Sequence, residues 1–146
     1  PLPDASVDVI ISNCVVNLAP DKDAVFQEIY RVLRPGGRMS ISDIVVDGDL
    51  PPAIRSRLDA WAGCVAGALD EKVYLAKIRA AAFEDVEVIS RDYAQAEAEQ
   101  AMELLAGEDG RPAAEAEASA LLAEAGVSPA DLGRKIASVK VRARKP

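Results

Sequence analysis

Two cysteines are the residues of this sequence best suited to binding chemistry. Cys14 comes just after a short apolar run, and Cys64 lies within a predicted helix. The sequence contains no histidine, which removes the commonest general base and the commonest metal ligand. Two cysteines are also too few for a zinc ribbon or a disulfide scaffold. Thiolates are ligands for soft ions, but a cysteine is more often a small buried hydrophobic residue, so residue type alone leaves both interpretations open.

Other residues are candidates because of where they lie. Asp43 ends a predicted strand, and we expect a solvated loop carboxylate because no basic partner is evident in the sequence. The alternative is a carboxylate that faces a cleft over the strand ends. Trp61 is most simply the anchor of its helix on the core, with a position in a ligand site as the other hypothesis. Tyr74 is predicted to be a core residue, and Asn17 has no special feature.

The elements that position these residues begin with a βαβ unit. Val7–Ser12 is a β-branched run with almost no polar alternation, which is typical of a strand covered on both faces. Asp21 caps a predicted helix with apolar residues at helical spacing, and Arg34–Gly37 ends it. Arg38–Ile44 alternates as a second strand does. Cys14 therefore lies just past the carboxyl end of a strand, where ligands bind in open α/β sheets.

The rest of the chain is predicted to hold further helices and two more strands. Proline pairs, capping residues and apolar periodicity mark where they begin. The last strand alternates cleanly and is expected to be antiparallel and half-buried. The predicted elements are a helix opened by Pro51–Pro52 that carries Cys64, a helix over Glu71–Ala82 capped by Asp70, a strand over Phe83–Ser90, a short helix capped by Ser128, and a strand over Ile136–Ala143.

Length and composition limit the class of protein. The chain has 146 residues, of which 50% are hydrophobic and 28% charged, enough for one core and too few for two domains. The net charge of −7 argues against a general nucleic-acid surface, and no apolar run reaches the roughly 18 residues of a membrane span. We expect a cytoplasmic protein with a single partial domain over 1–146, in which about 93–126 forms an acidic helical insertion.

The domain is expected to be partial because only six residues precede Val7–Ser12. This strand would lie at an edge of the sheet, with unpaired amides and apolar side chains, which proteins rarely leave open. We therefore expect either that the chain is the back half of a larger domain or that a second copy covers the edge. The predicted assembly is a homodimer through the first strand, at about 7–12.

Three segments resemble one family of enzymes. Asp4–Leu18 resembles the fourth strand and following loop of S-adenosylmethionine-dependent methyltransferases, and within that superfamily it is most similar to the arsenite methyltransferases. Val32–Arg38 resembles the turn before the fifth strand of the superfamily. Trp61–Leu69 resembles the second cysteine motif of the arsenite methyltransferases. The resemblance covers the C-terminal half of such an enzyme, so the glycine-rich cofactor loop and a further functional cysteine are expected to lie outside this chain.

The resemblance implies the fold. It predicts an α/β structure, the C-terminal half of a class I (Rossmann-like) S-adenosylmethionine-dependent methyltransferase, with a mixed sheet of about four strands and helices on both faces. The implied strand order is first, second, last, third, with the last strand antiparallel between its neighbours. The segment from Tyr93 to Gly126 matches the family poorly, and its role stays open.

The resemblance also implies the chemistry. Cys14 and Cys64 would bind trivalent arsenic as thiolates, and arsenite or its thiol conjugate would be the methyl acceptor. Asn13 would offer its amide to the methionine end of S-adenosyl-L-methionine, or it caps a turn, as Asn commonly does. An arsenic lone pair that attacks the methyl group needs no general base, which agrees with the absence of histidine.

Two alternatives remain beside arsenite methylation. The chain is either part of another small-molecule methyltransferase with incidental cysteines, or a truncated, non-catalytic module that self-associates. Arsenic binding by the cysteine pair separates the first alternative from the main hypothesis, and cofactor binding separates the second. We expect the isolated chain to be inactive, because its cofactor loop is absent.

Overall fold

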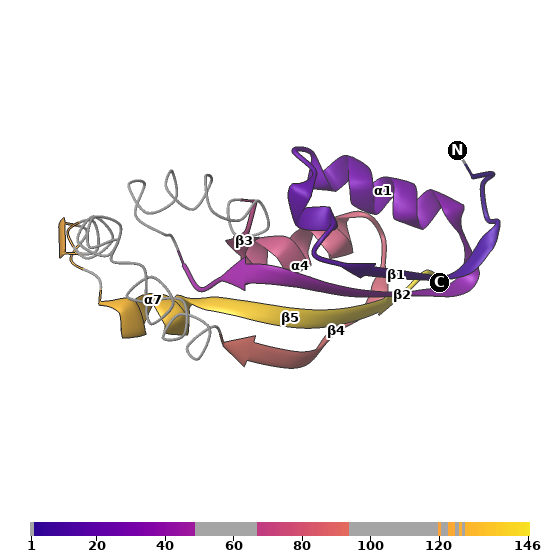
Figure 1. Ribbon diagram of the computed structural model, residues 1–146. Coiled ribbons are helices and arrows are strands. Elements are labelled where there is room, and N and C mark those ends of the chain that lie inside the picture. Colours follow the sequence, from indigo (N-terminus) through magenta and orange to yellow (C-terminus); the bar gives the residue numbers. More distant parts are fainter. Residues whose placement is uncertain (1, 49–66, 94–119, 121–122, 125, 127) are drawn as a thin grey trace, which may run out of the picture.

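One mixed sheet forms the centre of the protein (Figure 1). The computed structural model describes residues 2–48, 67–93, 120, 123–124, 126 and 128–146. The strands follow the order β1–β2–β5–β4, with the short β3 beside β2. Their bounds are Val7–Asn13 for β1, Leu33–Val46 for β2, Leu69–Asp70 for β3, Glu84–Tyr93 for β4 and Ile136–Arg144 for β5.

The strand directions confirm the predicted topology. β1 and β2 run parallel, and β5 runs antiparallel between β2 and β4. The predicted order of first, second, last and third strand is therefore correct, while β3 was not predicted. β2 is longer than expected at both ends, and at its amino end Arg34–Gly37 continues it as extended chain with Gly36 at φ +79°.

Helix capping follows the sequence signals. The Asp21 carboxylate accepts the Ala24 N–H at 3.0 Å before α1 (Lys22–Val32). Asp70 accepts the backbone N–H groups of Lys72 and Val73 before α4 (Glu71–Ala80). Both predicted N-caps are confirmed, as is Ser128 before α7 (Pro129–Lys135), where its hydroxyl accepts the Asp131 N–H. A single 3-10 turn, η1 (Val16–Leu18), precedes α1.

The core lies between the sheet and two helices. α1 and α4 lie side by side on the same side of the sheet (Figure 1), and the rings of Phe26 and Tyr74 meet edge to face with centroids 5.5 Å apart. Inward residues of the central strands β2 and β5, such as Ile41 and Val139, are fully buried beneath them. Alternation along these strands sends every second side chain into this layer, as the period of a strand requires.

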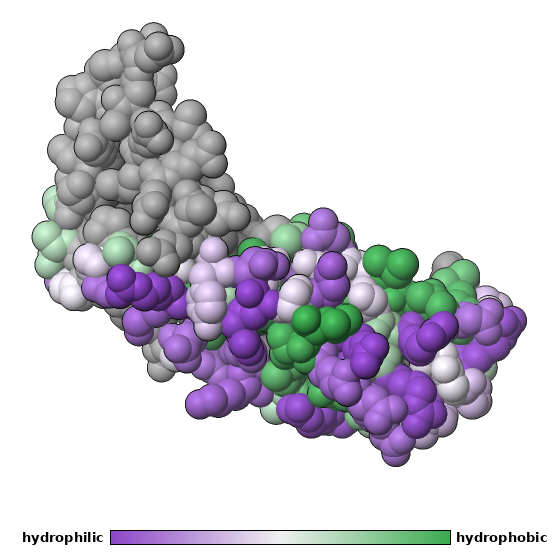
Figure 2. Space-filling view, turned by 90° about the horizontal axis from the view of Figure 1, so that it is seen from below, coloured by the Kyte–Doolittle hydropathy of each residue, from purple (hydrophilic) through white to green (hydrophobic). Residues whose placement is uncertain are grey.

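The opposite face of β1 is open in the part of the chain that the structure describes. Val9 and Ile11 are 49% and 79% exposed. Figure 2 views the molecule from the side away from α1 and shows hydrophobic side chains gathered within an otherwise hydrophilic surface. The strand prediction for Val7–Ser12 is confirmed, whereas the described residues cover only one of its two faces.

Several predicted elements fall outside the described residues. These are the helix opened by Pro51–Pro52, with Trp61 and Cys64, and nearly all of the acidic insertion at about 93–126. No helix within the described ranges is long and apolar enough to cross a membrane.

Candidate functional site

Cys14 lies at the carboxyl edge of the sheet, directly after β1. Its side chain is half-buried and its backbone has φ +55°, in the left-handed region. Its N–H donates to the Ser42 carbonyl of β2 at 2.8 Å. A non-glycine residue in this conformation costs roughly 1 kcal/mol, so the surrounding structure must hold it there. The strain alone does not single out Cys14, because Ala5, Ala82 and Asp85 also have positive φ.

Residues 14–19, here called the Cys14 loop, are attached to β2 and α1 through Asn17. The Asn17 side-chain amide donates to the Ile44 carbonyl of β2 at 2.6 Å. The Lys22 amino group, from the first turn of α1, donates to the Asn17 and Ala19 carbonyls at 3.2 and 3.1 Å. Sequence reasoning missed Asn17, although it is almost fully buried.

Asp43 corrects a sequence-based expectation. We expected a solvated carboxylate at the end of a strand, but Asp43 is 0% exposed and lies within β2. The Tyr74 hydroxyl of α4 donates to its Oδ2 at 2.7 Å. The expectation was wrong because this partner comes from a helix 31 residues away in the sequence. The alternative hypothesis, that Asp43 faces a cleft over the strand ends, stays a prediction.

The pKa shifts in this cluster follow from burial. Burial raises the pKa of Asp43, against the opposing effects of the Tyr74 hydroxyl, the Lys22 charge and the Asn17 N–H. Burial also lowers the pKa of Lys22, while Asp43 opposes that shift. Burial raises the pKa of Tyr74 strongly, with Asp43 and then Cys14 adding to the effect. Tyr74 is therefore a protonated donor to Asp43, as well as the core residue that was predicted.

The chain returns to the Cys14 loop at Gly67. A Cβ atom at this position would lie 1.9 Å from the Asn17 carbonyl oxygen, so no larger residue fits without a shift of the backbone. Gly67 follows Cys64 by three residues in the sequence. The second cysteine motif thus leads directly to a residue packed on the loop that carries the first cysteine, although Cys64 itself and Trp61 lie outside the described residues.

Asn13 is the last residue of β1, and its side chain is exposed. It pairs with Ser42, and the alternation of β1 directs it away from the face that α1 and α4 cover. Asn13 therefore presents an exposed amide at the carboxyl edge of the sheet. The glycine pair Gly36–Gly37 lies instead at the amino end of β2, where it pairs with the chain around Lys145. The roles predicted for Asn13 stay predictions.

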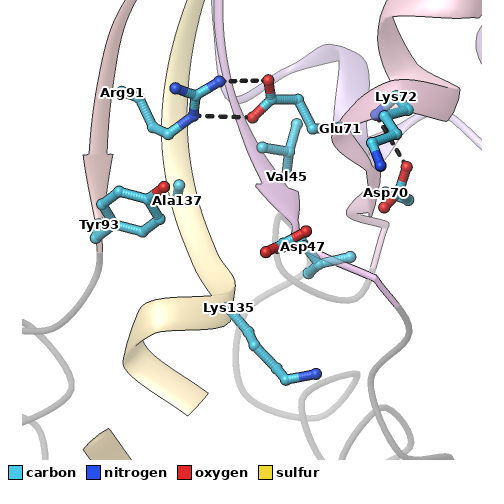
Figure 3. A pocket seen from close by; sticks show the side chains of 10 residues that line it. Val45, Asp47, Asp70, Glu71, Lys72, Arg91, Tyr93, Lys135 and Ala137 are labelled. Atoms are coloured by element: carbon cyan, nitrogen blue, oxygen red, sulfur yellow. Dashed lines mark hydrogen bonds and ion pairs between the residues drawn. The ribbon is translucent and has the colours of Figure 1, made fainter. Parts of the chain in front are cut away.

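A hollow of about 200 Å³ lies at the carboxyl ends of β2 and β4 (Figure 3). Arg91 and Glu71 face each other across it in a two-pronged ion pair, in which the Arg91 Nε donates to Glu71 at 2.9 Å. Tyr93 and Asp47 also line it. No sequence signal pointed to this hollow, because its residues come from separate elements. In this ion pair the charges of Arg91 and Glu71 neutralise each other.

Comparison with known proteins agrees with the fold. A model of the methyltransferase domain family matches residues 1–106. The arsenite methyltransferase of Halobacterium salinarum is 50% identical over 92 residues, which are 63% of this chain and 24% of that protein. The arsenite methyltransferase of Homo sapiens is 48% identical over 64 residues, 44% of this chain and 17% of that protein. The chain thus spans a quarter or less of these relatives.

Solved structures confirm the predicted fold class. An arsenic(III) S-adenosylmethionine methyltransferase from Chlamydomonas reinhardtii superposes with a TM-score of 0.63 at 30% identity, over 99% of this chain and 38% of that one. A geranyl diphosphate C-methyltransferase from Streptomyces coelicolor gives a TM-score of 0.63 at 16% identity, over 100% of this chain and 49% of that one, which shows the fold alone. The chain therefore belongs to the methyltransferase domain family of S-adenosylmethionine-dependent enzymes and is related to the arsenite methyltransferases within it.

Proposed function

We propose that this chain carries the acceptor part of an arsenite methyltransferase, with Cys14 and Cys64 as thiolate ligands of trivalent arsenic. The observation that carries the proposal is the Cys14 loop. Its cysteine is held in a left-handed conformation at the carboxyl edge, and Gly67, three residues after Cys64, packs on the same loop. The identity to arsenite methyltransferases over 92 residues supports the same assignment.

The proposed methyl transfer needs no general acid or base from this chain. Thiolates suit a soft centre such as trivalent arsenic, and two of them fix the direction of its lone pair. S-adenosylmethionine, when bound, supplies an electrophilic methyl group on a sulfonium. The residues of this chain then contribute orientation of the acceptor and exclusion of water from it. Asn13 is the residue proposed to contact the cofactor, and the main cofactor loop is proposed to lie outside this chain.

The test is a titration of the reduced chain with arsenite, followed through the fluorescence of Trp61, the single tryptophan. Trp61 lies three residues from Cys64 in the sequence, so arsenic bound there should quench or shift its emission. We expect a saturable change that both Cys14→Ser and Cys64→Ser abolish. Leu18→Ser is the matched control, because Leu18 is 58% exposed, lies in the same loop and leaves both thiols in place.

The outcomes decide between the candidate functions. Retention of full arsenite affinity in both serine variants would remove the basis of the assignment. Absence of any response at millimolar arsenite would favour a different small-molecule acceptor. Methylation of arsenite by the isolated chain would refute the proposal that the cofactor loop is supplied from outside it.

We propose that the chain assembles with a second copy through β1. This strand stands at the end of the sheet order and exposes Val9 and Ile11, which supports a partner strand at 7–12. We expect a homodimer in which each copy shields the first strand of the other. Light scattering at micromolar concentration tests this, and a monomer with the same circular dichroism would count against it.

A further inference from the structure

Hydrogen bonds hold the Cys14 loop at its start, in its middle and at its end. The loop leads from β1 into α1 (Figure 1). At its start, the Cys14 N–H donates to the Ser42 carbonyl at 2.8 Å. In its middle, the Asn17 side-chain amide donates to the Ile44 carbonyl at 2.6 Å. Both of these acceptors belong to β2, whereas the end of the loop is held by Lys22 of α1.

Lys22 reaches back from α1 to the loop. Its amino group donates to the carbonyl groups of Asn17 and Ala19 at 3.2 and 3.1 Å. Lys22 is only 7% exposed, which is rare for a lysine. It also lies in the first turn of α1, where the helix dipole disfavours a cation. An ammonium group in such a place needs acceptors. Because the loop carbonyls are these acceptors, the positions of Lys22 and of the loop depend on each other.

The Asn17 carbonyl is also the contact point of a further segment, which arrives at Gly67. A Cβ atom at Gly67 would lie 1.9 Å from the Asn17 carbonyl oxygen and 3.4 Å from the Lys22 Nζ. Gly67 lies just before β3, which pairs with β2. The Asn17 carbonyl oxygen thus accepts from Lys22 and faces Gly67 at a distance that leaves no room for a side chain. The loop, α1 and the chain before β3 therefore meet at one carbonyl group.

We propose that Lys22 and Gly67 are positioning residues for Cys14. Both act on the Asn17 carbonyl: Lys22 holds its oxygen by a hydrogen bond, and Gly67 leaves the space that it occupies. With this carbonyl fixed, the loop keeps the hydrogen bond of the Cys14 N–H to β2. As far as arsenic is concerned, this inference rests on the proposed function. The placement of the loop does not, and it can be measured without arsenic.

The test follows amide hydrogen exchange in the reduced full chain by nuclear magnetic resonance. The Cys14 N–H exchanges only when its hydrogen bond to the Ser42 carbonyl opens. Lys22→Met keeps most of the side-chain volume and removes the donor. We expect the Cys14 N–H to exchange about tenfold faster in this variant, the effect of a lost hydrogen bond to a charged group. Gly67→Ala pushes the Asn17 carbonyl away from Lys22 and should give a similar increase.

The double variant Lys22→Met/Gly67→Ala tests whether the two residues act on one group. If they do, their effects are not additive, and the Cys14 N–H exchanges at most about twice as fast as in the faster single variant. Lys77→Met is the matched control. Lys77 of α4 also reaches α1, but its amino group donates to the Asp23 carboxylate. It should leave the exchange of the Cys14 N–H unchanged.

Three results would overturn the proposal. The first is exchange of the Cys14 N–H within about twofold of the parent in a folded Lys22→Met or Gly67→Ala chain. The second is a double variant whose effect is the product of the two single effects. The third is an equal rise at the amide groups of the central strand β5, because the whole fold would then be loosened. Circular dichroism identifies any variant that does not fold, and either single variant then decides.

A second measurement separates this inference from the proposed function. Lys22→Met should weaken arsenite binding about tenfold, and Lys77→Met should leave it unchanged. If the parent chain binds no arsenite, the proposed function fails, while the exchange of the Cys14 N–H still tests the placement of the loop. If arsenite binds and Lys22→Met alters neither affinity nor exchange, the positioning role fails and the proposed function stands. Faster exchange with unchanged affinity would overturn the role of Lys22 in arsenic binding.

Discussion

The buried layer between the sheet and the helices has two regions of different character. Around Phe26, Ile41 and Val139 it is apolar, and near the carboxyl edge it holds Asp43 and Lys22. Apolar contacts are not directional and supply the free energy of folding in proportion to the area that they bury. Buried polar groups each need a partner at a defined place. The comparison indicates that the first region stabilises the fold and the second fixes the Cys14 loop.

The largest effect is expected from the apolar region. Phe26 is 0% exposed and packs on Tyr74, so Phe26→Ala leaves a cavity under both helices. We expect the free energy of unfolding to fall by about 3–5 kcal/mol, measured by urea denaturation. Leu18→Ala, an exposed control, should cost well under 1 kcal/mol. A loss below about 1 kcal/mol for Phe26→Ala would show that the helices do not depend on this contact.

A smaller effect is expected where the two regions meet. Tyr74→Phe keeps the ring in the apolar region and removes the donor to Asp43. The free energy of unfolding should fall by about 1–3 kcal/mol, because a buried carboxylate loses a partner. Urea denaturation beside Tyr30→Phe measures it. An equal loss in both variants would mean that the Asp43 contact has no special weight.

The polar region should also make stability depend on pH. Because burial raises the pKa of Asp43, the native state keeps the proton of this carboxyl to a higher pH than the unfolded chain does. Between the unfolded pKa of about 3.9 and the raised native value, the native state binds more protons, so the free energy of unfolding falls as the pH rises. Asp43→Asn should remove this fall. Parallel stability–pH curves for the two chains would refute the assignment to Asp43.

The smallest effect is expected at the surface above the apolar region. Lys77 of α4 and Asp23 of α1 form an ion pair at 2.5 Å, with Asp23 more than half exposed. Lys77→Ala should cost about 0.5 kcal/mol or less at low salt, and less still in 1 M NaCl. A loss of 2 kcal/mol would show that the ion pair, rather than the ring contact beneath it, joins the two helices.

The apolar region could be predicted from the sequence, and the polar region could not. Periodicity and capping signals gave the strands and helices that carry Phe26 and Val139, together with the strand order through the resemblance. These signals are local. The hydrogen-bond donor to Asp43 is Tyr74 of α4, which lies 31 residues away in the sequence. A carboxylate without a local cation was therefore taken for a solvated one.

The candidate site also has a part that could be predicted from the sequence and a part that could not. Cys14 was identified because it follows a strand in a motif that resembles the family, and its place at the carboxyl edge followed from the βαβ unit. Its left-handed backbone and the close approach of Gly67 to Asn17 depend on tertiary packing. Asn17 was overlooked for this reason, since nothing in its own neighbours marks it as buried.

The central claim is that Cys14 and Cys64 bind trivalent arsenic together. X-ray absorption spectroscopy of the reduced chain, loaded with arsenite and freed of added thiol, counts the sulfur atoms around arsenic directly. The account predicts sulfur from both cysteines in the parent chain and one sulfur fewer in Cys14→Ser and in Cys64→Ser. Arsenic surrounded only by oxygen, or an unchanged sulfur count in either variant, would contradict it.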